Sequence, residues 1–129
     1  MRNAWEGIAF ERLCMWHQDA IKAALGIAGV AADISSWRSA KKTGGTQIDM
    51  LIDRKDGVVN LCEMKFSRDE FAIGDAYAKK LRERIELFRS ETGTRKSIHL
   101  TFVTSYGVKR NENSDIVQSQ VTLDDLFKV

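Results

Sequence analysis

Two strand-like segments on either side of a short glycine turn constrain this sequence more than any other feature. Residues 47–53 and 58–66 are rich in apolar side chains, and an Asp-Gly pair lies between them. A short loop of this composition between two such runs is a strong signal for a β-hairpin. If the loop has three residues, Arg54 pairs with Val58, and Gly57 takes the left-handed conformation that such loops favour.

That pairing determines which side chains of the hairpin face one another. Counting outward from the loop brings Asp49 directly opposite Glu63, with Cβ atoms roughly 5 Å apart. Gln47 shares a face with Asp49, and Lys65 shares a face with Glu63, because side chains alternate along a strand. Two opposed carboxylates repel each other unless a divalent cation lies between them. The hairpin therefore predicts a site for Mg²⁺, which prefers oxygen ligands.

The N-terminal segment predicts a long helix that is buried on much of its circumference. Asn3 and Glu6 fit a capping box, and two glycines bracket the end of the helix. One apolar stripe at helical spacing comprises Trp5, Ala9, Leu13, Trp16, Ala20 and Ala24. A second set widens it: Phe10, Cys14, Ile21 and Leu25. We therefore expect Trp5 and Trp16 to belong to the core.

The rest of the chain predicts one further long helix and several strands. A strand is expected at about residues 30–37, before a turn that contains Lys41, Lys42, Gly44 and Gly45. A helix is expected from Gly74-Asp75 to Thr92-Gly93, followed by a strand over 98–104. A short strand over 117–121 and a final helical turn capped by Thr122 complete the order. Helices and strands in this order predict an α/β fold with a central mixed sheet flanked by helices.

Composition allows several functions and excludes few. The 129 residues fit one domain, 1–129, and the net charge of +2 permits nucleic-acid binding without requiring it. A basic cluster, usually a solvated face, could contact phosphates: Lys79, Lys80, Arg82, Arg84, Arg89, Arg95 and Lys96. Cys14 and Cys62 have no zinc-ligand spacing and suit the core. Without a signal peptide or an apolar span, the expected location is cytoplasmic.

The arrangement Asp49…Glu63-x-Lys65, on a hairpin that follows a helix, resembles the signature of the PD-(D/E)XK nucleases. The chain also looks like the C-terminal domain of prokaryotic AAA+ ATPases. The segments that carry this second resemblance are Gly7, Phe10-Glu11, Gly45, Gln47-Ile48-Asp49, Cys62-Glu63-Met64-Lys65-Phe66, Tyr77, Thr104-Ser105-Tyr106-Gly107 and Val121-Thr122-Leu123-Asp124-Asp125-Leu126-Phe127. The resemblance implies a restriction-endonuclease-like fold with a helix-βββ-helix-β core.

The resemblance also implies roles for particular residues. Glu11, Asp49 and Glu63 would hold Mg²⁺ or Mn²⁺, while Lys65 assists catalysis. Ile48 stands where the classical motif has proline, which removes no ligand. The sequence contains no GxxxxGK[ST] phosphate loop, so the domain is either excised from a longer ATPase or a stand-alone relative.

Two functions follow from these features. The first is a metal-dependent nuclease that hydrolyses phosphodiester bonds, of DNA rather than RNA. The second is an inactive module of the same fold that binds nucleic acid or a partner ATPase domain. Within the site, Glu11 is either a metal ligand or an ordinary exposed helix residue. Gln47 either contacts substrate or hydrogen-bonds Lys65.

Overall fold

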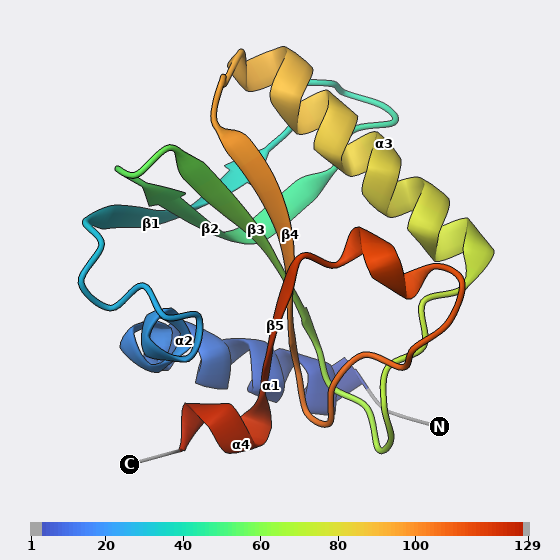
Figure 1. Cartoon of the computed structure of the whole chain (residues 1–129). Coiled ribbons are helices and arrows are strands. Elements are labelled where there is room, and N and C mark those ends of the chain that lie inside the picture. Colours follow the sequence, from blue (N-terminus) through green and yellow to red (C-terminus); the bar gives the residue numbers. More distant parts are fainter. Residues whose placement is uncertain (1–3, 128–129) are drawn as a thin grey trace.

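The computed structural model describes residues 4–127, which form a five-stranded sheet with helices on both faces. In chain order the elements are α1 (Ala4–Trp16), α2 (Gln18–Ala24), β1 (Ala32–Arg38), β2 (Gln47–Arg54), β3 (Val58–Lys65), α3 (Asp75–Thr92), β4 (Ser97–Thr104), a 3₁₀ turn (Ser114–Ile116), β5 (Ser119–Thr122) and α4 (Leu123–Leu126). The helix α3 lies on one side of the sheet, and α1, α2 and α4 lie on the other (Figure 1).

The sheet is mixed, and its strands lie in sequence order from β1 to β5. The pairs β1–β2 and β2–β3 are antiparallel, whereas β3–β4 and β4–β5 are parallel. Parallel neighbours need a crossover connection, and α3 provides it between β3 and β4. This topology makes β3 a central strand, so its side chains are covered on both faces.

The core is divided into two layers by the sheet. The layer beneath α1 and α2 contains Phe10, Cys14 and Ile21, packed against strand residues such as Met50 and Cys62. The layer beneath α3 forms two clusters of helix and strand residues: Ile48, Leu51, Val59, Leu61 and Phe88 in one, and Ile73, Ala78, Leu81, Leu100 and Phe102 in the other. Side chains of β3 therefore alternate between the layers, with Leu61 facing α3 and Cys62 facing α1.

Local sequence signals correctly predicted several elements. The hairpin pairs Met50 with Cys62 and Leu51 with Leu61, which is the predicted register, and Gly57 has a φ of 91°. The helix α3 begins after Gly74 and ends before Gly93, and Gly93 adopts the left-handed conformation. At α4, Thr122 and Asp125 form a reciprocal capping box. These features depend on residues close together in sequence.

The prediction for the N-terminal helix was wrong in two respects. The helix is interrupted at His17, so that α1 and α2 are separate elements. Trp5 and Trp16 are 74% and 84% exposed, whereas Phe10 and Cys14 are buried. Apolar side chains occupy most of the circumference of this helix, so its sequence does not show which of them face the core. Contact between α1 and β3 buries Phe10 and Cys14 and leaves the two tryptophans exposed. The predicted Asn3 cap lies outside the described residues.

The two cysteines are free and buried, as the sequence indicated. Burial and then the neighbouring Glu11 carboxylate raise the pKa of the Cys14 thiol to about 12, and burial also raises the pKa of Cys62. Both thiols therefore stay protonated and behave as small apolar residues. Within residues 4–127, no helix is long and apolar enough to span a membrane.

Candidate active site

A β-bulge lies at the point where β2 carries Asp49. Ser35 pairs with Leu51 and Trp37 pairs with Ile48, so Ser36 alone lies against both Asp49 and Met50. A bulge of this kind breaks the alternation of side chains and re-aims them. Ile48 accordingly packs beneath α3, whereas Met50 packs beneath α1.

The β2–β3 ladder keeps its predicted register from Asp53 to Met50, where Met50 pairs with Cys62. Asp49 and Glu63 occupy the next step, just beyond the pairs of this ladder. In the part of the chain that the structure describes, they are thus neighbours in register but not members of a bridged pair. The bulge and the end of the ladder together place Asp49 at the margin of the sheet, with its side chain exposed to solvent.

Glu63 is buried, 8% exposed, and two residues of α3 hold its carboxylate. The Tyr77 hydroxyl donates a hydrogen bond to Glu63 Oε1 at 2.9 Å, and Arg84 Nη1 lies 2.7 Å from the same oxygen. Burial raises the pKa of Tyr77, and the Glu63 carboxylate raises it further, so the hydroxyl stays a donor. A buried carboxylate needs such partners because desolvation of an unpaired charge is costly.

Glu11 approaches the same region from α1. Burial raises the pKa of Glu11 above its ordinary value, and the charge and hydrogen bond of Asp49 raise it further. The Lys65 ammonium lowers this pKa and the Glu63 carboxylate raises it. Asp49, Glu63 and Lys65 therefore all lie within electrostatic reach of Glu11, although the four residues come from three different elements.

Lys65 and Gln47 complete the group of residues that the sequence indicated. The Lys65 ammonium lies 5.1 Å from the centre of the Tyr77 ring, which is a cation–π distance. Gln47 Nε2 donates to Asp49 Oδ1 at 2.6 Å and Gln47 Oε1 accepts from Arg38 Nη2 at 2.7 Å. Gln47 therefore orients Asp49, and this contact differs from the two roles that the sequence suggested.

The carboxylates fit a hard divalent cation by their chemistry, although their side chains do not converge on one point. Carboxylate oxygens suit Mg²⁺, which takes one or two of them and keeps several waters. Between residues 4 and 127, no three histidine, cysteine or acidic side chains stand ready to hold one ion. Glu63 Oε1 already contacts Tyr77 and Arg84, so a cation shared with Asp49 would have to use Glu63 Oε2 or displace one of these partners.

Sequence reasoning did not single out Tyr77 or Arg84 as partners of Glu63. The sequence indicated Tyr77 as one of the residues that carry the family resemblance, and Arg84 as part of a basic cluster. Their spacing of seven residues places both on one face of α3, two turns apart. That spacing was visible, but the sequence did not show that this face covers Glu63.

Comparison with known proteins supports the fold. No family model matches the chain, and no curated protein matches it. The protein of unknown function AF1548 matches 86% of this chain with a TM-score of 0.55 and 13% identity. A repair endonuclease from Pyrococcus abyssi matches 95% with a TM-score of 0.54 and 13% identity.

The chain spans 64% of the first structure and 48% of the second, so both matched proteins are longer than the shared part. At 13% identity the likeness concerns the fold alone. Together with the mixed sheet and its flanking helices, it identifies the architecture as restriction-endonuclease-like.

Proposed function

We propose that this chain is a metal-dependent nuclease domain that hydrolyses phosphodiester bonds of DNA. One observation carries the proposal: Asp49 and Glu63 take neighbouring register positions at one end of the β2–β3 hairpin, and both lie, with Lys65, within electrostatic reach of Glu11. The restriction-endonuclease-like fold supports it, since that fold also occurs in a repair endonuclease. Fold alone does not specify chemistry, so the argument depends on the residues of the site.

In this proposal Glu11, Asp49 and Glu63 would hold Mg²⁺ or Mn²⁺. Such an ion, when bound, polarises a phosphoryl oxygen and lowers the pKa of bound water. Lys65 would stabilise the charge that develops on the phosphate, or orient the attacking water. Gln47 would hold Asp49 in position, while Tyr77 and Arg84 would position Glu63.

The first test is calorimetric titration of the wild type with Mn²⁺ and Mg²⁺, beside Asp49→Ala and Glu63→Ala. We expect binding in the wild type and its loss in both variants. Asp33→Ala is the matched control, because Asp33 is an exposed carboxylate on β1 whose only ion pair, within residues 4–127, is with Lys55 at 3.6 Å. Binding that survives in both site variants would contradict the metal site.

The second test is cleavage. Plasmid, linear duplex, single-stranded DNA and RNA would be incubated with the wild type and Mg²⁺ or Mn²⁺. We expect cleavage of at least one DNA substrate, dependent on the cation and lost in Lys65→Ala. Cleavage that Lys65→Ala retains in full would argue against the role of Lys65.

The second candidate is a non-catalytic module that binds nucleic acid or an ATPase domain, the latter suggested by the resemblance to AAA+ C-terminal domains. The ion pair between Arg84 and Glu63 favours this candidate, because a guanidinium then neutralises the carboxylate without a metal. Such a module should bind its partner equally well as Asp49→Ala and with no divalent cation. It should also leave every nucleic-acid substrate intact.

A further inference from the structure

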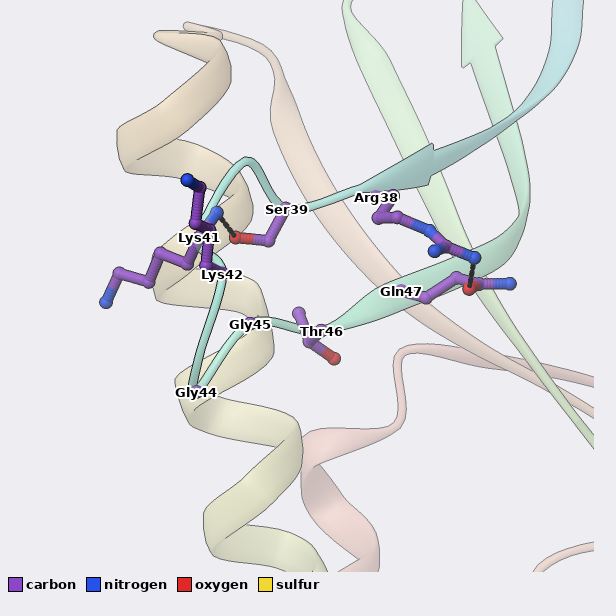
Figure 2. A pocket seen from close by; sticks show the side chains of 8 residues that line it. All are labelled: Arg38, Ser39, Lys41, Lys42, Gly44, Gly45, Thr46 and Gln47. Carbon is purple, nitrogen blue, oxygen red and sulfur yellow. Dashed lines mark hydrogen bonds between the residues drawn. The ribbon is translucent and has the colours of Figure 1, made fainter.

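A connection between β1 and β2, residues 39–46, lies alongside α3 and borders two hollows. The first, of about 340 Å³, is lined by the loop itself and by the strand residues Arg38 and Gln47 (Figure 2). The second, of about 350 Å³, lies between Gly44–Thr46 and α3, where Lys80, Glu83, Arg84 and Leu87 line it. Both hollows are lined by Gly44, Gly45 and Thr46, so they border the same stretch of the loop, and the two together are called the groove.

The groove carries an excess of positive charge. Five cationic residues and one carboxylate line the groove. The cationic residues are Arg38, Lys41, Lys42, Lys80 and Arg84, and the carboxylate belongs to Glu83. Among residues 4–127, the three lysines form no salt bridge, although Lys41 lies close enough to the Glu91 carboxylate to lower its pKa. Farther along α3 the lining adds Glu86 beside Arg82, which ends the cationic stretch.

The loop is held in place at both of its ends. Glu91 of α3 accepts hydrogen bonds from Ser39 Oγ at 2.7 Å and from the Ala40 backbone at 2.9 Å. At the other end Arg84 Nε donates to Thr46 Oγ1 at 2.8 Å. A loop fixed before binding loses less conformational entropy when a ligand arrives.

Glycine is required within this loop for a steric reason. A Cβ atom added at Gly45 would lie 3.0 Å from the Lys41 carbonyl oxygen and 3.2 Å from the Ser39 side chain. The backbone at Gly45 thus lies so close to Ser39 and Lys41 that a side chain at position 45 would displace them. Gly44 adopts a φ of +69°, which residues with a side chain rarely adopt.

Two residues connect the groove directly to the candidate active site. Arg84 contacts Thr46 in the loop and Glu63 in the site. Gln47 contacts Arg38 at the groove and Asp49 in the site. A strand of nucleic acid whose backbone followed the groove would therefore pass beside the carboxylates.

We propose that this groove binds the sugar–phosphate backbone of the nucleic-acid substrate next to the phosphate that is cleaved. The inference deepens the proposed nuclease function and rests on it for the identity of the ligand. Lysines and arginines around a phosphate backbone supply affinity and register without reading bases. The groove is thus a positioning site that tolerates many sequences.

The test is fluorescence anisotropy with labelled DNA and RNA oligonucleotides in EDTA, where no cleavage interferes. We expect Lys41→Ala/Lys42→Ala to bind about tenfold more weakly than the wild type. Its dependence of log K on log salt should be shallower by roughly 0.7 to 0.9 for each lysine that contacts a phosphate. If the wild type binds RNA and not DNA, the groove remains a backbone-binding site, but its substrate is RNA.

The matched control is Lys109→Ala/Arg110→Ala, which removes the same charge from an exposed loop after β4. We expect this control to bind nearly as well as the wild type. Equal weakening in both double variants would overturn the proposal, because net charge alone would then explain affinity. The proposal would also be overturned if Lys41→Ala/Lys42→Ala bound the oligonucleotides as tightly as the wild type, or if the wild type did not bind them.

A second variant alters the geometry of the loop and leaves its charges in place. Gly45→Ala should weaken binding by several-fold, because the added methyl group pushes the two arms apart. Gly29→Ala is its control, since a Cβ there meets nothing within 4 Å. Thermal unfolding of both variants would establish that the fold is intact; unchanged affinity in a folded Gly45→Ala would argue against a preformed loop and overturn that part.

Cleavage assays with Mg²⁺ separate this inference from the proposed function. If the wild type cleaves DNA and Lys41→Ala/Lys42→Ala binds and cleaves equally well, the groove is wrong and the function stands. If binding depends on the two lysines but nothing is cleaved, the groove stands and the nuclease proposal fails.

Discussion

The two ends of the β2–β3 hairpin handle their charges in opposite ways. At the turn, each carboxylate has its own cation: Lys96 lies 2.5 Å from Asp53, and Arg54 lies 2.7 Å from Asp56. The hydrogen bond from Arg54 lowers the pKa of Asp56. Charges matched in this way contribute to the fold and leave no demand for an external ion.

At the other end, three carboxylates gather near two cations. Arg84 pairs with Glu63 and Lys65 lowers the pKa of Glu11, yet that pKa still rises because burial and Asp49 disfavour the charge. The contrast teaches that carboxylates within one hairpin can have opposite purposes. Those with their own partners stabilise the structure, whereas we propose that those in excess bind an external cation.

The largest expected effect distinguishes the two ends by activity. Asp49→Asn and Glu63→Gln should each lower the cleavage rate on the order of 10²–10³-fold, because each removes a carboxylate that would hold the cation at the reacting phosphate. Asp53→Asn removes a carboxylate from the same strand at the turn and should change the rate by no more than about twofold, since it does not reach the site. Steady-state cleavage of labelled DNA measures both. Similar losses at the two ends would end the distinction.

The next effect distinguishes them by stability. Arg84→Met leaves the buried Glu63 carboxylate without its cation and should lower the free energy of unfolding by about 2 kcal/mol. Lys96→Met breaks the more exposed pair with Asp53 and should cost less than about 1 kcal/mol. Urea denaturation measures both values. If a cation binds at Glu63, Mg²⁺ should stabilise both variants, and Arg84→Met more strongly, because no guanidinium then competes for the Glu63 carboxylate.

A smaller effect sharpens the role of α3 at the site. Tyr77→Phe keeps the ring beside Lys65 but removes the hydroxyl that donates to Glu63. We expect kcat to fall roughly tenfold, as for other groups that orient a ligand, with KM nearly unchanged. Tyr106→Phe, an exposed tyrosine outside the site, is the control. A change in KM alone would indicate that Tyr77 contacts substrate instead.

The smallest effect concerns pH and the anchor of the β1–β2 loop. Hydrogen bonds from the Ala40 backbone and then Ser39 lower the pKa of Glu91. Its contribution to stability is therefore fully present above the ordinary carboxyl pKa and is lost as pH falls through the lowered value. Glu91→Gln should be less stable than the wild type near neutral pH, and the difference should shrink in acid. Glu86→Gln should show no such convergence.

Much of the fold could be predicted because its signals are local. The Asp-Gly turn determined the hairpin register, and Gly93 marked the end of α3. The same register brought Asp49 and Glu63 to neighbouring positions, which is why the candidate site could be named from the sequence. The roles assigned to Asp49, Glu63, Lys65 and Glu11, and the cation itself, remain predictions.

What the sequence could not provide depends on contacts between distant residues. The bulge at Asp49 arises from pairing with β1, which is only partly encoded in β2. The partners of Glu63 come from α3, and this helix carries three arginines without indicating which one faces the sheet.

The sequence by itself determined the order of elements, the register of β2 with β3, and the caps of α3 and α4. Turn residues, periodicity and capping side chains act over a few positions, so they can be recognised along the chain. Only the tertiary structure decided which stripe of α1 is buried, how Glu63 is paired, and that the β1–β2 loop lies against α3. Those outcomes depend on which surfaces meet when the layers pack, because burial selects among several local patterns that are otherwise equally compatible with the sequence.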